Sequence, residues 1–407
     1  ELLQLQFSTG GHSPFDGIER VLPGETIVIA GGGVVDRRRH AALPSGGPVR
    51  IGERDALDRL DTALTDSVDM HQRADVPYAM FLSGGVDSAA VLALMARLND
   101  TPVCAYTAGF PGTDAADERG HARDVARSLG AEHVEVSFDA ADFWAVLPAV
   151  AAAMDEPVAD YAILPTWKLA KEAAKSHKVI LSGEGGDEIF GGYGRYRSLM
   201  RPWWMGGRGM RRRGIMDGLG VLRRDDLAWR DGITGAEAVA RTDGRSRLQV
   251  AQAVDCADWL PNDLLTKLDR CLMAHGIEGR TPFLDPAVAN AAFCLPDSLK
   301  IKGRLGKWIL RKWLDDAAPA AQAFARKKGF TVPVGEWIAA EGARIGPLVA
   351  AQSGVAERCH PDAVKALFTS PGKRERFAAW TLLFFALWHQ RHIVGEAAEG
   401  DAFDALS

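Results

Sequence analysis

The sequence predicts an α/β fold, in which a parallel sheet carries helices on both faces and is followed by a mainly helical C-terminal part. Between about residues 52 and 181, short apolar runs alternate with stretches whose apolar residues recur at helical spacing. Strands that alternate with helices in this way form parallel sheets. Residues 234–390 have mainly helical patterning, so this part of the chain is expected to add helices to the sheet.

The individual elements follow in chain order. Apolar spacing predicts helices over about 52–72, 88–98, 118–129, 140–153 and 164–175. Short apolar runs predict buried strands at 76–82, 103–107, 133–137 and 179–181. Glycine-rich turns follow the first and the fourth of these strands, at 83–85 and 183–186. Because ligands of parallel sheets bind at the carboxyl ends of the strands, both turns are expected to face one site.

Two segments lie outside this alternating pattern. Residues 1–47 read as β-structure and turns and are too few to bury a good core alone, so we expect them to form the edge of something larger. Residues 199–232 hold eight arginines and three tryptophans, a composition that could bind RNA. We favour a solvated insertion, or a contact with another domain, because the overall charge is acidic.

Composition limits the class of partner. The 407 residues carry a formal net charge of −5, which gives no reason to expect nucleic acid or an anionic membrane as the main partner. The five cysteines are scattered and include no CxxC pair, which indicates reduced thiols in a cytoplasmic protein. No apolar run is long enough to predict a membrane-spanning helix.

The hexapeptide SGGVDS at 83–88 stands directly between a predicted strand and a predicted helix. Its glycines let the backbone turn tightly and point amide N–H groups at a bound oxyanion, and the helix N-terminus favours phosphate. Ser83 and Ser88 offer hydroxyl donors. Asp87 would repel phosphate unless a cation intervenes, so it implies Mg²⁺. A plain capped turn is the alternative interpretation.

A second glycine-rich segment, SGEGGDEIFGGY at 182–193, places three acidic residues among five glycines. Such a composition suits neither a helix nor a strand interior. It predicts a loop that holds carboxylates near a metal–nucleotide complex, and an acidic surface turn is the alternative.

Taken in order, these motifs resemble known signatures. SGGVDS resembles the pyrophosphate-binding loop of the N-type ATP pyrophosphatases, whose fold is adenine nucleotide α-hydrolase-like, and no Walker loop occurs. Residues 182–193 resemble the SGEG-x-DE-x-FGGY signature of the asparagine synthetase family. Blocks at 269–285 and 302–333 resemble that family's DR…PFLD block and its Lys-x-x-LR and R-x-K-x-GF elements. The resemblance covers about residues 50–340.

The resemblance implies a role for each matching residue. It assigns Mg²⁺ to Asp87 and Asp187, and it assigns catalysis to Glu184 and Lys307. Glu184 would organise the attack of ammonia on an acyl-adenylate, and Lys307 would contact the α phosphate. The residues assigned to ATP and pyrophosphate are Leu82, Ser83, Gly84, Gly85, Asp87, Ser88, Ala108, Ser182 and Gly183.

The resemblance also implies a division of the chain into four parts. These are a remnant of an N-terminal glutaminase domain of the Ntn type at 1–47, a PP-loop ATP pyrophosphatase core at 50–198, the basic insertion at 199–232 and a helical part at 233–395. The glutaminase domain normally begins with a catalytic cysteine, whereas the first cysteine here is Cys104. We expect that part of a longer chain is missing, and the alternative is a protein that uses free ammonia.

The predicted function is therefore that of a ligase that adenylates a carboxylate with Mg·ATP and then amidates it, converting aspartate to asparagine with ammonia from glutamine. The expected partners are a small-molecule carboxylate and ammonia or glutamine, and a homodimer is left open. One alternative is a specialised amidotransferase for a natural product, peptide or cell-surface polymer, since a fold does not fix its acyl substrate. A non-catalytic scaffold relative is the third interpretation.

Overall fold

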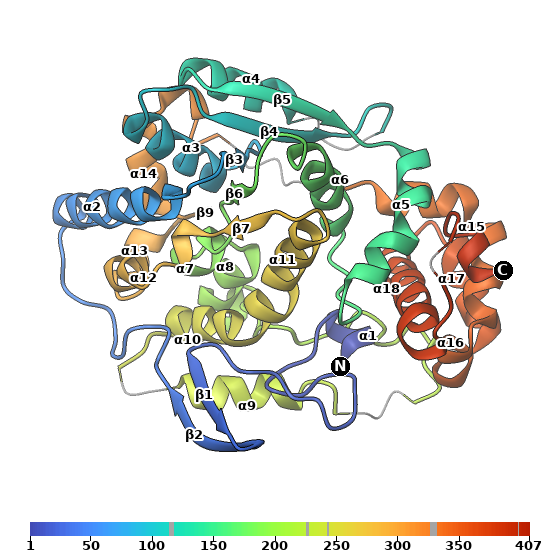
Figure 1. Ribbon diagram of the computed structural model, residues 1–407. Helices are drawn as coiled ribbons and strands as arrows, with labels where there is room; N and C mark the ends of the chain where they lie inside the picture. The colour runs from blue at the N-terminus through green and yellow to red at the C-terminus, as the bar shows by residue number, and fades with distance from the viewer. Residues whose placement is uncertain (114–117, 225–227, 242–243, 326–331, 398) are drawn as a thin grey trace.

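The centre of the molecule is a parallel sheet of five strands in the order β5-β4-β3-β6-β7 (Figure 1). The computed structural model describes residues 1–113, 118–224, 228–241, 244–325, 332–397 and 399–407. All neighbouring strands of the sheet run parallel, which confirms the predicted fold class. The strands are β3 (Tyr78–Phe81), β4 (Cys104–Gly109), β5 (Glu132–Ser137), β6 (Val179–Leu181) and β7 (Glu278–Arg280).

The sequence did not predict β7. Its three residues are Glu-Gly-Arg, so no apolar run marks them as a strand. The strand pairs with β6 from Val179↔Glu278 to Leu181↔Arg280, and this pairing brings the block at 269–285 to the edge of the sheet.

Side chains that alternate along the strands build a core on each face of the sheet. Met80 belongs to a buried cluster with residues of α2, α3 and α14, whereas its neighbour Ala79 belongs to a cluster with residues of α6 and α11. The helices around the sheet are α2 (Glu53–Gln72), α3 (Val86–Leu98), α4 (Arg119–Ser128), α6 (Ile163–Ala173), α11 (Thr266–Met273), α12 (Pro286–Ala292) and α14 (Trp308–Ala317).

A separate helical group packs beside the sheet and has its own buried cluster around Trp380 and Phe143 (Figure 1). It confirms the prediction that the C-terminal part is mainly helical. Its members are α5 (Ala140–Ala153), α15 (Val334–Ala351), α16 (Ser353–Arg358), α17 (Pro361–Thr369), α18 (Lys373–His389), the π-helix η5 (Gln390–Val394) and the 3-10 turn η6 (Asp404–Leu406). The residues 326–330 of the predicted R-x-K-x-GF element lie outside the described part of the chain.

The remaining elements connect these layers. α10 (Arg247–Val254) continues through the π-helix η2 (Asp255–Leu265) into α11, and π-helical turns inside helices often mark functional sites. The others are α7 (Gly186–Phe190), α8 (Gly194–Met200), η1 (Trp203–Met205), α9 (Asp231–Ala240), η3 (Pro282–Leu284), α13 (Asp297–Lys300), β8 (Ile301–Lys302), β9 (Leu305–Gly306) and η4 (Pro319–Ala321).

The described residues of the basic segment 199–232 include both exposed and buried side chains. Trp203 and Trp204 are 82% and 71% exposed. Arg211, by contrast, is largely buried, pairs with Asp255 at 3.4 Å and lies over the ring of Trp259 at 5.0 Å. The segment is therefore fixed at one arginine to the helix that runs into α11.

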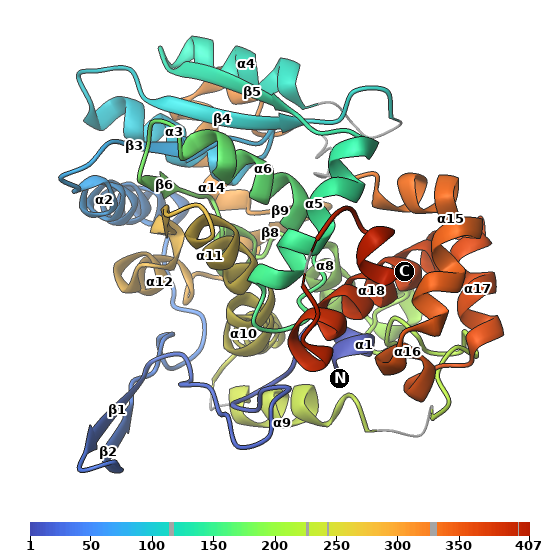
Figure 2. The same ribbon diagram turned by 45° about the vertical axis from the view of Figure 1, so that its right-hand side comes forward.

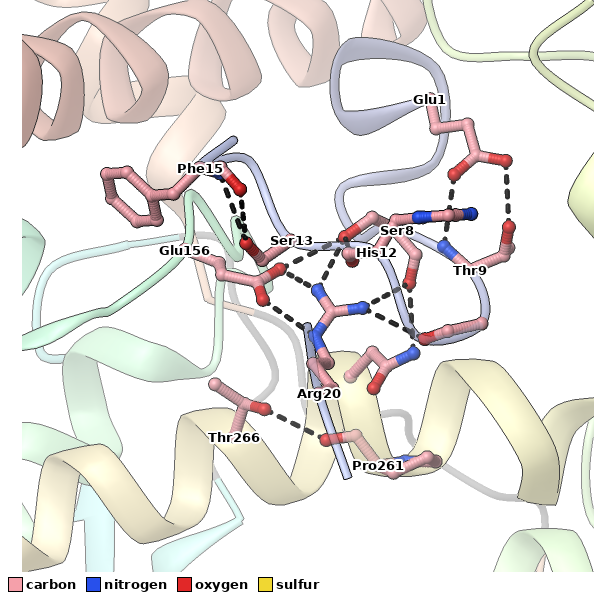
Figure 3. Close-up of polar contacts among 12 residues, drawn as sticks. Glu1, Ser8, Thr9, His12, Ser13, Phe15, Arg20, Glu156, Pro261 and Thr266 are labelled. Atoms are coloured by element: carbon pink, nitrogen blue, oxygen red, sulfur yellow. Dashed lines mark hydrogen bonds and ion pairs between the residues drawn. The ribbon is translucent and has the colours of Figure 1, made fainter. Parts of the chain in front are cut away.

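The N-terminal residues divide into an anchored part and a projecting part. Residues 1–20 include a short helix, α1 (Leu2–Leu5), where only β-structure and turns were expected. Arg20 donates from Nε to Glu156 Oε1 at 2.7 Å and also bonds Ser8, which fixes this segment to the loop before α6 (Figure 3). The hairpin of β1 (Glu25–Ala30) and β2 (Gly33–Arg39) projects away from the sheet (Figure 2).

Within the described residues, no helix is long and apolar enough to cross a membrane.

Candidate active site

The two glycine-rich loops meet because the strands that precede them are neighbours. β3 leads into the loop 83–85 and β6 leads into the loop 182–186, and β3 pairs with β6 in parallel. The loops touch so closely that a Cβ atom on Gly183 would lie 2.8 Å from the backbone nitrogen of Ser88. Glycine at this position therefore permits the contact, and the predicted convergence of the two turns on one site is confirmed.

A cavity of about 570 Å³ opens over these loops at the carboxyl ends of the strands. Every residue that the sequence predicted for the site lines it. They are Leu82, Ser83, Gly84, Gly85, Asp87, Ser88, Ala108, Ser182, Gly183, Glu184, Asp187 and Lys307.

The SGGVDS loop forms a small network of donors. The backbone N–H of Ser83 donates to Ser88 Oγ at 3.0 Å, and the N–H of Gly85 donates to Ser83 Oγ at 3.2 Å. The N–H of Gly84 donates to the carboxylate Oε2 of Glu118 at 3.1 Å. An anionic oxygen thus already sits on a loop amide, which is the contact that a phosphate oxygen would make.

Lys307 lies on the other side of the same loops. Its Nζ contacts Asp187 Oδ1 at 2.8 Å and also pairs with Asp87. Burial opposes the charge on this ammonium, but Asp187 and Asp87 more than offset that effect and raise the pKa of Lys307. The lysine therefore stays charged although its side chain is only 4% exposed.

Two local features hold Lys307 in this place. It is the N-cap of α14 and has a left-handed backbone, with φ 57° and ψ 34°, a conformation that costs a non-glycine residue about 1 kcal/mol or more. A Cβ atom on Gly192 would lie 2.2 Å from Lys307 Cε and 1.7 Å from Asp187 Oδ1. Only glycine at 192 leaves room for this ion pair.

The arrangement fits a magnesium ion that is shared with a nucleotide. Asp87 and Asp187 both pair with the ammonium of Lys307, and both lie near the guanidinium of Arg311. Across the described residues, no group of three or more His, Cys, Asp or Glu side chains could form a complete protein cage for a metal. Mg²⁺ in nucleotide sites is characteristically held by one or two carboxylates together with substrate phosphates, and these two aspartates match that pattern.

Glu184 lies in a different part of the cavity, next to a second buried lysine. Lys267 Nζ contacts Glu184 Oε1 at 3.2 Å and Asp160 Oδ2 at 3.3 Å. Burial again opposes the charge, and the carboxylates of Asp160 and Glu184 outweigh it and raise the pKa of Lys267. After the roles that the sequence predicts for Lys307 and Glu184, we call the Lys307 side the nucleotide end of the cavity and the Lys267 side, where Glu184 lies, the acyl end.

The third acid of the loop, Glu188, is buried beneath the cavity. Burial, reinforced by the negative charge of Asp187, raises the pKa of Glu188 to about 8. The hydroxyl of Tyr193 donates to its Oε1 at 2.7 Å. Near neutral pH this acid is therefore mostly protonated and adds little negative charge to the nucleotide end.

Sequence reasoning missed several residues that line the cavity: Glu118, His121, Asp160, Tyr193, Trp259, Lys267 and Arg311. Two of them lie close in sequence to residues of the family motifs. Asp160 follows the Asp155-Glu156-Pro157 tripeptide, and Lys267 precedes the Asp269-Arg270 pair by two positions. Neither residue is part of a run with distinctive composition, so only the packing of α11 beside α6 reveals them.

Comparison with known proteins places this chain in a family. A sequence profile described as "Asparagine synthase" matches residues 59–390. A putative asparagine synthetase [glutamine-hydrolyzing] of Mycobacterium bovis is 33% identical over 82% of this chain and 57% of its own length. Asparagine synthetase [glutamine-hydrolyzing] 1 of Bacillus subtilis is 28% identical over 92% of this chain and 66% of its own length.

Two further matches are more distant. Asparagine synthetase B [glutamine-hydrolyzing] of Escherichia coli is 26% identical over 69% of this chain and 46% of its own length. A solved structure of NMN synthetase from Francisella tularensis is 20% identical over 35% of this chain and 59% of that chain, with a TM-score of 0.25, a similarity too low to carry an argument. The chain spans less than two thirds of the length of these curated relatives. On the profile match and the Mycobacterium similarity, the chain belongs to the asparagine synthase family.

Proposed function

We propose that the chain adenylates a carboxylate with Mg·ATP, releases pyrophosphate, and then amidates the acyl-adenylate, releasing AMP. The observation that carries this proposal is the cavity with two ends, each of which holds a buried lysine between two carboxylates. One end suits phosphate and a divalent cation, and the other suits an acyl group and an amine.

At the nucleotide end, the amides and hydroxyls of residues 83–88 would bind the pyrophosphate oxygens of ATP. Asp87 and Asp187 would hold Mg²⁺, which supplies charge neutralisation at the phosphates when it is bound. Lys307 would then contact the α phosphate as the substrate carboxylate attacks it, because a lysine is a mobile point charge. If Asp87 and Asp187 held Mg²⁺, the ammonium of Lys307 would be free for that contact.

At the acyl end, ammonia would attack the activated carbonyl. A C–N bond forms, the bond from the acyl carbon to the AMP oxygen breaks, and the nitrogen loses a proton. Glu184 and Asp160 both line this end, and Glu184, the more exposed of the two, accepts that proton in our proposal. Water must stay out of the cavity during this step, since it would hydrolyse the adenylate.

For the substrate we propose aspartate, with ammonia supplied by glutamine, because the relatives are named glutamine-hydrolysing asparagine synthetases. The hairpin supports a further domain as the glutamine-using part. Two paired strands alone are marginally stable, and Ile29 and Val35 on this hairpin are 68% and 61% exposed. We retain the division into parts at 1–47, 50–198, 199–232 and 233–395, and a cytoplasmic location, as proposals.

The test is the release of AMP and pyrophosphate from Mg·ATP with aspartate, with and without ammonium, on the whole chain. Aspartate-dependent release together with asparagine formation supports the proposal. Well-folded protein that binds Mg·ATP but stays silent with aspartate contradicts the substrate assignment. A screen of other carboxylates would then test a specialised amidotransferase.

A further inference from the structure

Lys267 occupies a place that structural packing alone does not explain. It lies on α11, its side chain is 4% exposed, and its ammonium bridges two chain segments that are far apart in sequence. One of its partners, Glu184, belongs to the glycine-rich loop after β6. The other, Asp160, belongs to the loop before α6. Burying an ammonium is costly unless it is paired. The two carboxylates offset that cost, so we asked what the buried charge does for them.

Glu184 and Lys267 both line the cavity, but they differ in exposure. The side chain of Glu184 is 25% exposed, whereas that of Lys267 is 4% exposed. Glu184 is therefore the more accessible of the two groups. The loop that carries Asp160 is itself fixed, because Glu156 four residues earlier pairs with Arg20 (Figure 3).

Two carboxylates, Asp160 and Glu184, pair with the ammonium of Lys267. A third carboxyl group, Asp263, lies nearby, and burial, reinforced by Asp160, raises its pKa to about 8, so that it is mostly protonated near neutral pH. Without the ammonium, Glu184 and Asp160 would lose the cation that lies between them and would repel each other. The titratable groups that face Lys267 are Asp160, Glu184, Asp263, Tyr161 and Cys271.

We propose that Lys267 is a positioning residue for the amide-forming step, and that its ammonium pairs with the carboxylate of Glu184 and holds it turned toward the acyl end of the cavity. The inference rests on the proposed function and extends it to a residue that acts through Glu184. Only the ionised form of Glu184 can take the proton that the attacking nitrogen gives up. Asp160 contacts the same ammonium, so the two carboxylates share one positive charge.

Two substitutions should move the amide-forming step in opposite directions. In Lys267→Met, loss of the ammonium should lower amide formation near neutral pH by about 100-fold and move the acidic limb of its pH profile toward alkaline pH by about one unit or more. In Asp160→Asn, removal of a competing negative charge should move the same limb toward acid pH. The amide oxygen of asparagine can still accept the N–H of Ala162 that Asp160 Oδ1 accepts now.

The measurement is single-turnover formation of pyrophosphate and of asparagine from aspartate, Mg·ATP and ammonium across the pH range. Pyrophosphate formation should stay within about threefold of the unsubstituted chain, because only the amide step needs the proton acceptor. Lys300→Met is the matched control. Lys300 is also a buried lysine, but it bonds Gln252 and Phe293 and does not line the cavity. Its replacement should therefore change neither the ratio of asparagine to pyrophosphate formed nor the acidic limb of the pH profile of amide formation.

Equal loss of pyrophosphate and asparagine in Lys267→Met, with an unmoved pH limb, would overturn the proposal. A limb that moves the same way in both variants would also overturn it. An unsubstituted chain that is inactive with aspartate would count against the proposed function instead.

Thermal unfolding supplies a second readout that needs no turnover. At about pH 8, Lys267→Met should lower the melting temperature by roughly 4 °C, since breaking a buried ion pair strands its carboxylates. Adding Glu184→Gln to that variant should recover part of the loss. No recovery in the double variant would mean that Lys267 and Glu184 are not coupled, and the inference would then fail even where the proposed function holds.

Discussion

Buried lysines in the cavity and the buried lysine beside α10 have pKa values that are shifted in opposite directions. Three lysines of the described chain are buried: Lys267, Lys300 and Lys307. The two in the cavity each lie between two carboxylates, and their pKa values are raised. Lys300, outside the cavity, donates to the carbonyl oxygen of Phe293 and the amide oxygen of Gln252, and burial lowers its pKa to about 8.

This difference in charge distinguishes the two lysines that we place in the site from one that serves packing alone. A lysine that bonds neutral oxygens can lose its proton without breaking its contacts, so the protein gains nothing from keeping it charged. A lysine held by two carboxylates keeps its charge through the neutral range. Such charge is useful where phosphate or a reacting amine must be handled, and both charged lysines line the one cavity that holds the predicted site residues.

The largest expected effect is at the nucleotide end. Lys307→Met should lower pyrophosphate release by about a thousandfold, because removing one group that stabilises transition-state charge costs that much in comparable sites. Lys302→Met is the matched control. Lys302 lies five positions earlier, is exposed, and stands over the ring of Trp308. Unchanged pyrophosphate release in Lys307→Met would contradict the proposal that the Lys307 end carries out the first step.

The lowered pKa of Lys300 should make the stability of the protein depend on pH. Its pKa falls from 10.5 in the unfolded chain to about 8 in the folded one. Between these values the unfolded state binds more protons, so the free energy of unfolding should rise with pH there, by up to about 3 kcal/mol. Lys300→Met should remove this rise. Denaturant unfolding of both proteins from about pH 7 to 10.5 measures it. Parallel curves would contradict the assignment.

The acyl end should respond to the loss of one charge at Glu184. Glu184→Gln keeps the shape of the side chain and should lower amide formation by about 100-fold, while pyrophosphate release should fall by less than about tenfold. Single-turnover assays of both products give the two values. Equal losses would show that Glu184 has no separate part in the second step.

The smallest expected effect tests the space around Lys307. Gly192→Ala adds a methyl group next to Lys307 and Asp187, and the resulting shift should cost about 1–3 kcal/mol and weaken pyrophosphate release. In the control, Gly120→Ala on α4, a Cβ atom meets nothing within 4 Å, so stability should stay equal or rise by up to about 1 kcal/mol. Thermal unfolding and pyrophosphate release of the two variants make the comparison.

The sequence singled out the two glycine-rich loops that line the nucleotide end because their chemistry requires particular residue types in short consecutive strings, but it did not single out Glu118 or Arg311. SGGVDS and the loop at 182–193 each combine glycines with hydroxyls or carboxylates in a way that neither a helix nor a strand needs. The four apolar strands were equally readable, since burial on both faces of a parallel sheet produces continuous apolar runs.

Other parts of the site could not be read in this way. Lys267 and Asp160 are single residues 107 positions apart, and their meaning arises only when α11 packs beside the loop before α6. β7 has a polar sequence, so no apolar run announces it. Lys307 was predicted from its motif alone. Its left-handed backbone at the start of α14 depends on its contacts with a loop about 120 positions earlier.

The central claim is that the two ends of the cavity carry out separate steps. Exchange of labelled pyrophosphate into ATP, with aspartate present and ammonium absent, tests it most directly because this reaction needs the first step alone. We predict that exchange survives in Glu184→Gln and is lost in Lys307→Met. Loss in both variants, or loss in Glu184→Gln alone, would contradict the account.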